Sequence, residues 1–122
     1  MDLACDTLGD EELKKQFAEM DLKISHNIQN IALDNGALNN ERENDKIDKK
    51  RVWWVEAESV VGFINAYQHS EEKKFLESAR SVWEYIKAEM IDKREGSEWY
   101  AEVSYDHKPH DWKEIVGPWK CP

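Results

Sequence analysis

Apolar residues recur along this chain at the spacing of amphipathic helices. In the segment 10–31 they lie three or four positions apart, so they line one side of a helix. A second helix is expected from about residue 53 to 68, and a third from about 70 to 92. The predicted apolar faces of the first and third helices are Leu13, Phe17, Met20, Ile24, Ile28 and Ile31, and Phe75, Ala79, Val82, Trp83, Ile86 and Met90.

The boundaries of these helices are marked by residues that suit helix ends. Residues 1–8 are expected to be the end of a helix that Gly9 terminates, and Asp10 is expected to cap the next one. Asn35-Gly36 is expected to stop the first long helix, and residues 39–50 are expected to form a polar connector.

Two features suggest a repeating helical architecture. Asp10-Glu11-Glu12 and Ser70-Glu71-Glu72 each resemble the acidic first turn of a helix, although acidic residues suit any helix start. The helix over 53–68 is apolar or small on most sides, so it should have neighbours on several sides. Together they suggest a piece of a larger layered structure.

Apolar and polar residues alternate over residues 98–105, which predicts a β-strand. Residues 106–109 predict a turn, and a short partner strand or loop is expected to follow. The fold class predicted from the pattern is therefore all-α, with a short β-hairpin near the C-terminus.

Length and charge narrow the classes of function. The 122 residues make one domain at most, residues 1–122, with a net charge of -9. This acidity disfavours nucleic acid and anionic membranes as partners, because phosphate binding needs a basic patch. With neither a signal peptide nor a membrane span expected, the protein is predicted to be cytoplasmic, with Cys5 and Cys121 as reduced thiols. A disulfide between them is possible but unsupported.

Tryptophans beside carboxylates are the main candidate chemistry. Six tryptophans are many for this length, and aromatic rings near carboxylates are typical of sugar sites. On a helix, Trp53 aligns with a core stripe that includes Val60, whereas Trp54 aligns with Glu58. Trp53 is therefore predicted to be core and Trp54 with Glu58 to face a site. The alternative is that both rings pack and Glu58 is solvated or ion-paired.

Two further residues are candidates for the same site. Arg51 precedes the second helix, where it could pair with Glu58 or bind a substrate hydroxyl, with a surface role as the alternative. Trp119 lies between Pro118 and Pro122, and prolines favour an extended loop. Such a loop could present the indole to a sugar, or Trp119 could simply fill a gap.

The histidines offer little evidence for a metal site. They are His26, His69, His107 and His110, and His107 and His110 with Cys121 match no strong zinc pattern. No metal is therefore expected. His107 falls at the predicted turn, where histidine tolerates the left-handed conformation better than most residues.

Residues 51–68, RVWWVEAESVVGFINAYQ, and 117–122, GPWKCP, closely resemble the C-terminal part of the N-acylglucosamine 2-epimerase family, and within it the cellobiose 2-epimerase branch. The resemblance covers nearly the whole chain, weakly over 1–50 and strongly over 51–122. It implies about the last third of an (α/α)6 barrel, an α/α toroid, without its final helix. Relative to that family, Glu56 replaces the usual glutamine, which costs stability if the charge is buried and unpaired.

The resemblance also implies a chemistry. Family members are isomerases that epimerise C2 of a reducing sugar, such as cellobiose or an N-acylhexosamine, through a cis-enediolate, and the cellobiose branch needs no cofactor. By this resemblance Trp54 and Trp119 would stack on the sugar, and Glu58 would bind hydroxyls or orient a histidine. Both catalytic histidines are expected outside this chain, one of them two residues after Pro122.

Two functions remain open from the sequence. The chain is either part of a sugar 2-epimerase that is inactive in isolation, or a non-catalytic helical module. Such a module would bind carbohydrate or self-associate, or it would pair with the missing barrel segments. An unrelated small helical protein is the third alternative.

Overall fold

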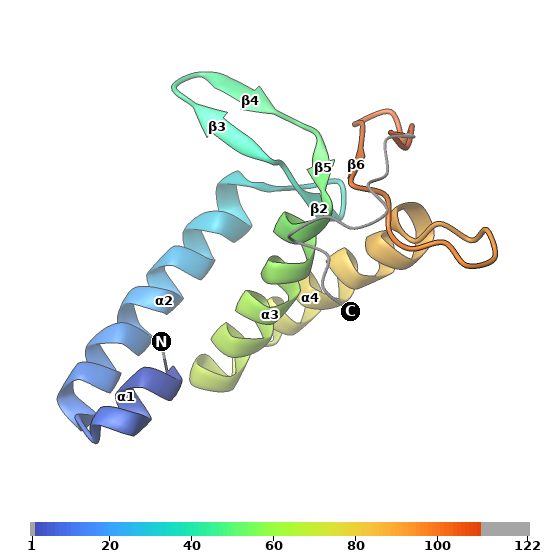
Figure 1. Ribbon diagram of the computed structural model, residues 1–122. Helices are drawn as coiled ribbons and strands as arrows, with labels where there is room; N and C mark the ends of the chain where they lie inside the picture. The colour runs from blue at the N-terminus through green and yellow to red at the C-terminus, as the bar shows by residue number, and fades with distance from the viewer. Residues whose placement is uncertain (1, 111–122) are drawn as a thin grey trace.

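The computed structural model describes residues 2–110, and this part of the chain is mostly helical with three two-stranded sheets (Figure 1). The helices are α1 (Asp2–Leu8), α2 (Glu11–Ile31), α3 (Trp53–Ser70) and α4 (Lys73–Tyr85), and α4 continues into the π-helix η1 (Ile86–Met90). The strands are β1 (Leu33–Asp34), β2 (Ala37–Leu38), β3 (Glu41–Glu43), β4 (Lys46–Asp48), β5 (Arg51–Val52) and β6 (Glu102–Val103). The predicted predominance of helix is confirmed.

The boundary between α1 and α2 lies where the sequence predicts it. Gly9 has a φ of 66°, in the left-handed region that glycine adopts readily, and its N–H donates to the carbonyl of Cys5 at 2.9 Å. Asp10 then caps α2, because its carboxylate accepts a hydrogen bond from the Leu13 N–H at 2.9 Å.

The apolar face of α2 is only partly covered. Leu22 and Ile28 pack against the core, as the helical spacing predicts for Ile28. Met20, Ile24 and Ile31 lie on the predicted face but are each more than 40% exposed. The described part of the chain therefore leaves much of this face open to solvent.

The segment between α2 and α3 forms two β-hairpins, and the polar connector predicted over 39–50 contains the second of them, which the sequence does not predict. β1 pairs with β2, and β3 pairs with β4 in a hairpin that projects from the helices (Figure 1). Asn35 and Gly36 have φ values of 58° and 86°, as the two central residues of a type I′ hairpin turn require. Asn35-Gly36 therefore forms a hairpin turn shortly after α2 ends at Ile31.

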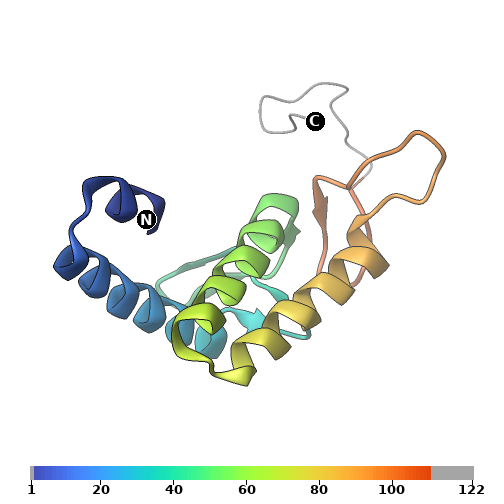
Figure 2. The same ribbon diagram turned by 90° about the horizontal axis from the view of Figure 1, so that it is seen from below.

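Helices α3 and α4 run side by side in opposite directions (Figure 2). Glu71 ends α3 with a left-handed φ of 58°, and the Ser70 hydroxyl accepts a hydrogen bond from the Glu72 N–H at 3.2 Å. Because α4 begins only at Lys73, Ser70-Glu71-Glu72 closes one helix and links it to the next. The predicted echo of the acidic turn at residues 10–12 is wrong.

The core lies mainly between α3 and α4. Its buried residues are Leu38, Phe63, Ala66, Phe75, Ala79, Val82, Ile86, Met90 and Val103. The face predicted for the third helix is therefore buried except for Trp83, which is 43% exposed. Trp53 is partly buried against this core, as predicted.

The C-terminal β-structure is shorter than the sequence predicts. Within residues 98–105 only Glu102–Val103 form a strand, and β6 pairs with β5 rather than with a following strand. A single bridge joins Val103 to Pro109 across the turn. The turn itself is confirmed, because His107 has a φ of 62° and its N–H donates to the Ser104 carbonyl at 3.0 Å.

The hairpin turn gives a first testable prediction. In Gly36→Ala, the new Cβ would lie 3.1 Å from the Ser81 hydroxyl oxygen. The alanine would also have to adopt the left-handed φ of 86°. We expect the free energy of unfolding to fall by about 1–2 kcal/mol, measured by urea denaturation.

The matched control is Gly62→Ala inside α3, where an added Cβ meets nothing within 4 Å. That substitution should raise the stability by about 0.5–1 kcal/mol, because alanine is the better helix former. Equal stability of Gly36→Ala and the unmodified chain would contradict the turn.

Candidate functional site

A small pocket of about 220 Å³ lies between α2, β2 and the first half of α3. It is lined by Ser25, Ile28, Leu38, Trp54, Val55, Glu58, Ser59, Gly62 and Phe63. The volume is below the range of roughly 300–1,000 Å³ that holds drug-sized ligands. The pocket therefore suits one small ring better than a whole disaccharide.

Trp54 and Glu58 both line this pocket, one helical turn apart on α3. The Trp54 side chain is 53% exposed and Glu58 is exposed as well. The structure thus brings these two predicted site residues together, and it separates exposed Trp54 from partly buried Trp53. An exposed indole beside a carboxylate offers a flat apolar surface and a hydrogen-bond acceptor.

Arg51 is buried, with only 2% of its surface exposed, so the alternative of a surface role is wrong. Its guanidinium donates to Asn39 Oδ1 and to the Asp34 carbonyl, both at 2.8 Å, and it lies 5.4 Å from the centre of the Tyr105 ring. These contacts tie β5 to the β1–β2 hairpin. Arg51 therefore supports the start of α3 from the interior.

Glu56 is fully buried on the opposite side of α3 from the pocket residues Trp54 and Glu58. Both carboxylate oxygens accept from the Leu38 N–H, at 3.1 and 3.0 Å. Burial raises the pKa of Glu56 to about 7, although the Leu38 N–H and the Arg51 charge act to lower it. Burial outweighs these two partners, so the neutral acid is favoured up to about neutral pH.

The sequence holds a signal for the burial of Glu56. Glu56 is three residues after Trp53 and four before Val60, which places it on the core stripe of the same helix. A carboxylate at such a position needs a partner from another segment, and here the hairpin supplies it.

The remaining predicted residues lie elsewhere. Trp119, with the rest of residues 117–122, and Cys121 lie outside the described residues. All four histidines are described, and none lines the pocket of Trp54 and Glu58. His26 lies 3.3 Å from Glu72, and His107 lies 3.6 Å from Glu89.

Neither a metal-ligand cluster nor a membrane-spanning helix occurs in the part of the chain that the structure describes. Within residues 2–110, no group of three His, Cys, Asp or Glu side chains is placed to hold a metal ion. In the same range, no helix is both long enough and apolar enough to cross a membrane.

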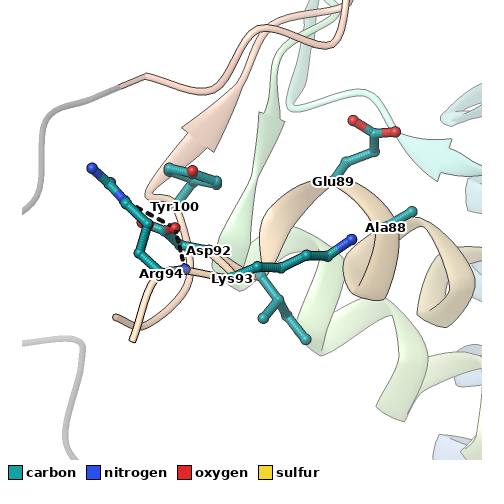
Figure 3. A pocket seen from close by; sticks show the side chains of 7 residues that line it. Ala88, Glu89, Asp92, Lys93, Arg94 and Tyr100 are labelled. Carbon is teal, nitrogen blue, oxygen red and sulfur yellow. Dashed lines mark hydrogen bonds and ion pairs between the residues drawn. The ribbon is translucent and has the colours of Figure 1, made fainter. Parts of the chain in front are cut away.

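A second, wider pocket of about 430 Å³ lies at the end of η1. It is lined by Ala88, Glu89, Ile91, Asp92, Lys93, Arg94 and Tyr100. Figure 3 shows Arg94 folded back over Asp92, with Lys93 pointing away from both. The buried Asp92 carboxylate accepts from the Arg94 guanidinium at 2.6 Å and from the Ser97 hydroxyl at 2.9 Å. These bonds order the loop itself, so this pocket offers less to a ligand.

The buried carboxylate predicts an unusual pH dependence of stability. The pKa of Glu56 is about 7 in the fold, against 4.5 for a solvated glutamate, so the folded chain holds a proton that the unfolded chain lacks between these two values. Stability should therefore fall as the pH rises from 4.5 to 7, by about 3 kcal/mol from this group. Glu56→Gln cannot ionise, and it should lose this dependence.

The measurement is urea unfolding at pH 5 and pH 8. The control is Glu77→Gln, at an exposed position of α4, which should keep the pH dependence of the unmodified chain. If Glu56→Gln instead lost stability relative to the unmodified chain as the pH rises, the attraction of the Arg51 charge would outweigh burial, and the raised pKa of Glu56 would be contradicted.

Known proteins resemble this chain over most or all of its length. The family model for N-acylglucosamine 2-epimerase (GlcNAc 2-epimerase) matches residues 15–120. Over all 122 residues the chain is 77% identical to a cellobiose 2-epimerase of Ruminococcus albus and 40% identical to one of Dictyoglomus turgidum. In each case the match spans 31% of the relative's length.

The fold is shared with solved epimerases. A crystal structure of a sugar epimerase from a ruminal bacterium matches with a TM-score of 0.94 at 77% identity, over 100% of this chain and 31% of that chain. The cellobiose 2-epimerase of Bacillus thermoamylovorans B4167 matches with a TM-score of 0.87 at 45% identity, over 98% of this chain and 30% of that one. The chain belongs to the N-acylglucosamine 2-epimerase family.

Proposed function

We propose that this chain is a C-terminal portion of a sugar 2-epimerase and supplies one wall of its sugar site. The observation that carries the proposal is the 77% identity to a cellobiose 2-epimerase over the whole chain. The pocket that contains Trp54 and Glu58 supports it, because these residues have the chemistry of a sugar site.

The architecture proposed for the complete protein is an (α/α)6 barrel. Helices α3 and α4 form an antiparallel pair, which is the repeating unit that such a barrel needs. The exposed apolar side chains Met20 and Ile24 on α2, and Leu76 and Trp83 on α4, suit contact with neighbouring helices on either side.

The proposed substrate is a reducing sugar of the glucose or mannose type, such as cellobiose. The ring opens, a histidine removes the C2 proton, a cis-enediolate forms, and a proton returns to C2 on the opposite face. Because the proton leaves and returns to one carbon, the reaction has no net oxidation and needs no redox cofactor.

Within that reaction the residues of this chain would bind and orient the sugar. Trp54 would stack on the apolar face of a pyranose, Trp119 would supply a second ring, and Glu58 would accept hydrogen bonds from hydroxyls or orient a histidine. The sequence makes Arg51 a candidate to bind a substrate hydroxyl or to pair with Glu58. The buried contacts of Arg51 with Asn39 and Asp34 favour a supporting role at the start of α3.

Proton transfer is proposed to depend on histidines outside this sequence. His26, His69, His107 and His110 do not line the pocket of Trp54 and Glu58. We therefore expect the isolated chain to bind the sugar without epimerising it.

The second candidate is a helical module that binds carbohydrate or associates with itself without catalysis. The partly uncovered apolar face of α2 favours it, since such surfaces often mark interfaces. Sedimentation velocity over a range of concentrations separates the two. A defined oligomer that binds cellobiose favours the module, and a monomer favours the epimerase portion.

The sugar site is tested by cellobiose titration, monitored by tryptophan fluorescence. Trp54→Ala should weaken cellobiose binding about tenfold, or ~1.4 kcal/mol, because the stacking surface is lost. Trp83→Ala is the matched control, since Trp83 is similarly exposed on α4 but lies outside the pocket.

The same samples in D₂O test catalysis, since epimerisation exchanges the C2 hydrogen with solvent. No deuterium should enter C2 with the isolated chain. Equal loss of binding in both variants would contradict the proposed site, and deuterium incorporation would contradict the absence of catalysis.

A further inference from the structure

We propose that Glu56 is a positioning residue for the pocket of Trp54 and Glu58. It holds the β2 wall of that pocket against α3, and loss of its proton allows the two walls to separate. The claim about the walls concerns this chain alone, whereas its consequence for sugar binding rests on the proposed function.

The geometry of the two walls carries the proposal. Leu38 lines the pocket from β2, while Trp54 and Glu58 line it from α3. The Leu38 N–H donates to both carboxylate oxygens of Glu56, at 3.1 and 3.0 Å. Because Leu38 both lines the pocket and binds Glu56, this buried interaction holds the β2 side of the pocket to α3.

Other contacts also hold the β1–β2 hairpin, but they do not titrate near neutral pH. The Arg51 guanidinium donates to Asn39 Oδ1 and to the Asp34 carbonyl, and the Ser81 hydroxyl donates to the Gly36 carbonyl at 3.3 Å. Arginine stays charged and a serine hydroxyl stays neutral in this range. Among these contacts, only the one with Glu56 changes charge.

The groups around Glu56 determine whether a rise in pH opens or closes the pocket. The Leu38 N–H on β2 and Arg51 on β5 favour the ionised carboxylate, while Tyr85 on α4 keeps its proton because burial raises its pKa to about 12. Burial of Glu56 outweighs both favourable partners and raises its pKa to about 7. The closed pocket therefore binds a proton that a solvated Glu56 would release.

The pKa values of Glu56 in the closed and the opened pocket set the pH range over which opening becomes easier. If opening exposes Glu56 to water, its pKa falls toward 4.5, the value of a solvated glutamate. Opening becomes easier as the pH rises from 4.5 to 7, by up to about tenfold per pH unit, and the effect levels off above 7.

Amide hydrogen exchange of the full chain tests the positioning role. With intrinsic exchange rates divided out, the protection of the Leu38 amide should fall up to about tenfold per pH unit between pH 5 and 7. Glu56→Gln keeps an acceptor for the Leu38 N–H but cannot ionise, so its Leu38 protection should not show this fall. Glu77→Gln should behave as the unmodified chain does.

The Val82 amide, in the buried part of α4, reports global unfolding. Leu38 should exchange faster than Val82, because the wall opens locally. If both amides exchanged at the same rate with the same pH dependence, the hairpin would open only when the whole chain unfolds. A positioning role for Glu56 would then be overturned.

Cellobiose affinity, measured over the same pH range, separates this inference from the proposed function. Affinity should fall between pH 5 and 7 in the unmodified chain and in Glu77→Gln, but not in Glu56→Gln. Binding with an identical pH profile in Glu56→Gln would overturn the inference and leave the sugar site intact. If the protection of the Leu38 amide changed with pH as expected but cellobiose did not bind, the wall contact would be supported and the sugar site overturned.

Discussion

The start of α3 depends on two polar side chains, Arg51 and Glu56, which are buried and bind the β1–β2 hairpin. Val52, at the N-cap position of this helix, offers no side-chain hydrogen bond to the first turn. Instead, Arg51 binds the Asp34 carbonyl on β1 and the Asn39 side chain just after β2, and Glu56 binds Leu38 at the end of β2. Burying such polar groups is unfavourable unless they are paired, and the hydrogen bonds from separate segments offset part of that cost. The position of the hairpin and that of the helix are thereby coupled.

The exposed side of α3 follows from this arrangement. Because Trp53 and Glu56 turn toward the core, Trp54 and Glu58 are left on the open side, one turn apart and beside Leu38 and Ile28. The proposed sugar wall is therefore formed by side chains whose neighbours in the sequence are fixed inside. An ionisable group at the buried position then gives the pocket a sensitivity to pH that a glutamine would not give.

Periodicity predicted the helices over 10–31 and 70–92 because each has a long repeat of apolar positions. The stripe of Trp54 and Glu58 was predicted from the four-residue spacing of a helix. Trp83 was misplaced because it lies at the edge of the predicted face, next to Val82 at its centre. The hairpins were missed because strands of two or three residues are too short to show alternation. The burial of Arg51 could not be predicted, since its partners Asn39 and Asp34 come from a separate segment.

Membership of the N-acylglucosamine 2-epimerase family and the geometry of the pocket lead to one central claim, that α3 presents Trp54 and Glu58 to a sugar. The most direct measurement is a cellobiose titration of the ¹⁵N-labelled chain, followed by NMR. The account predicts that the Trp54 indole and the amides of Leu38 and Glu58 shift together with one dissociation constant. Shifts confined to residues 88–100 around the second pocket, or none at all, would contradict it.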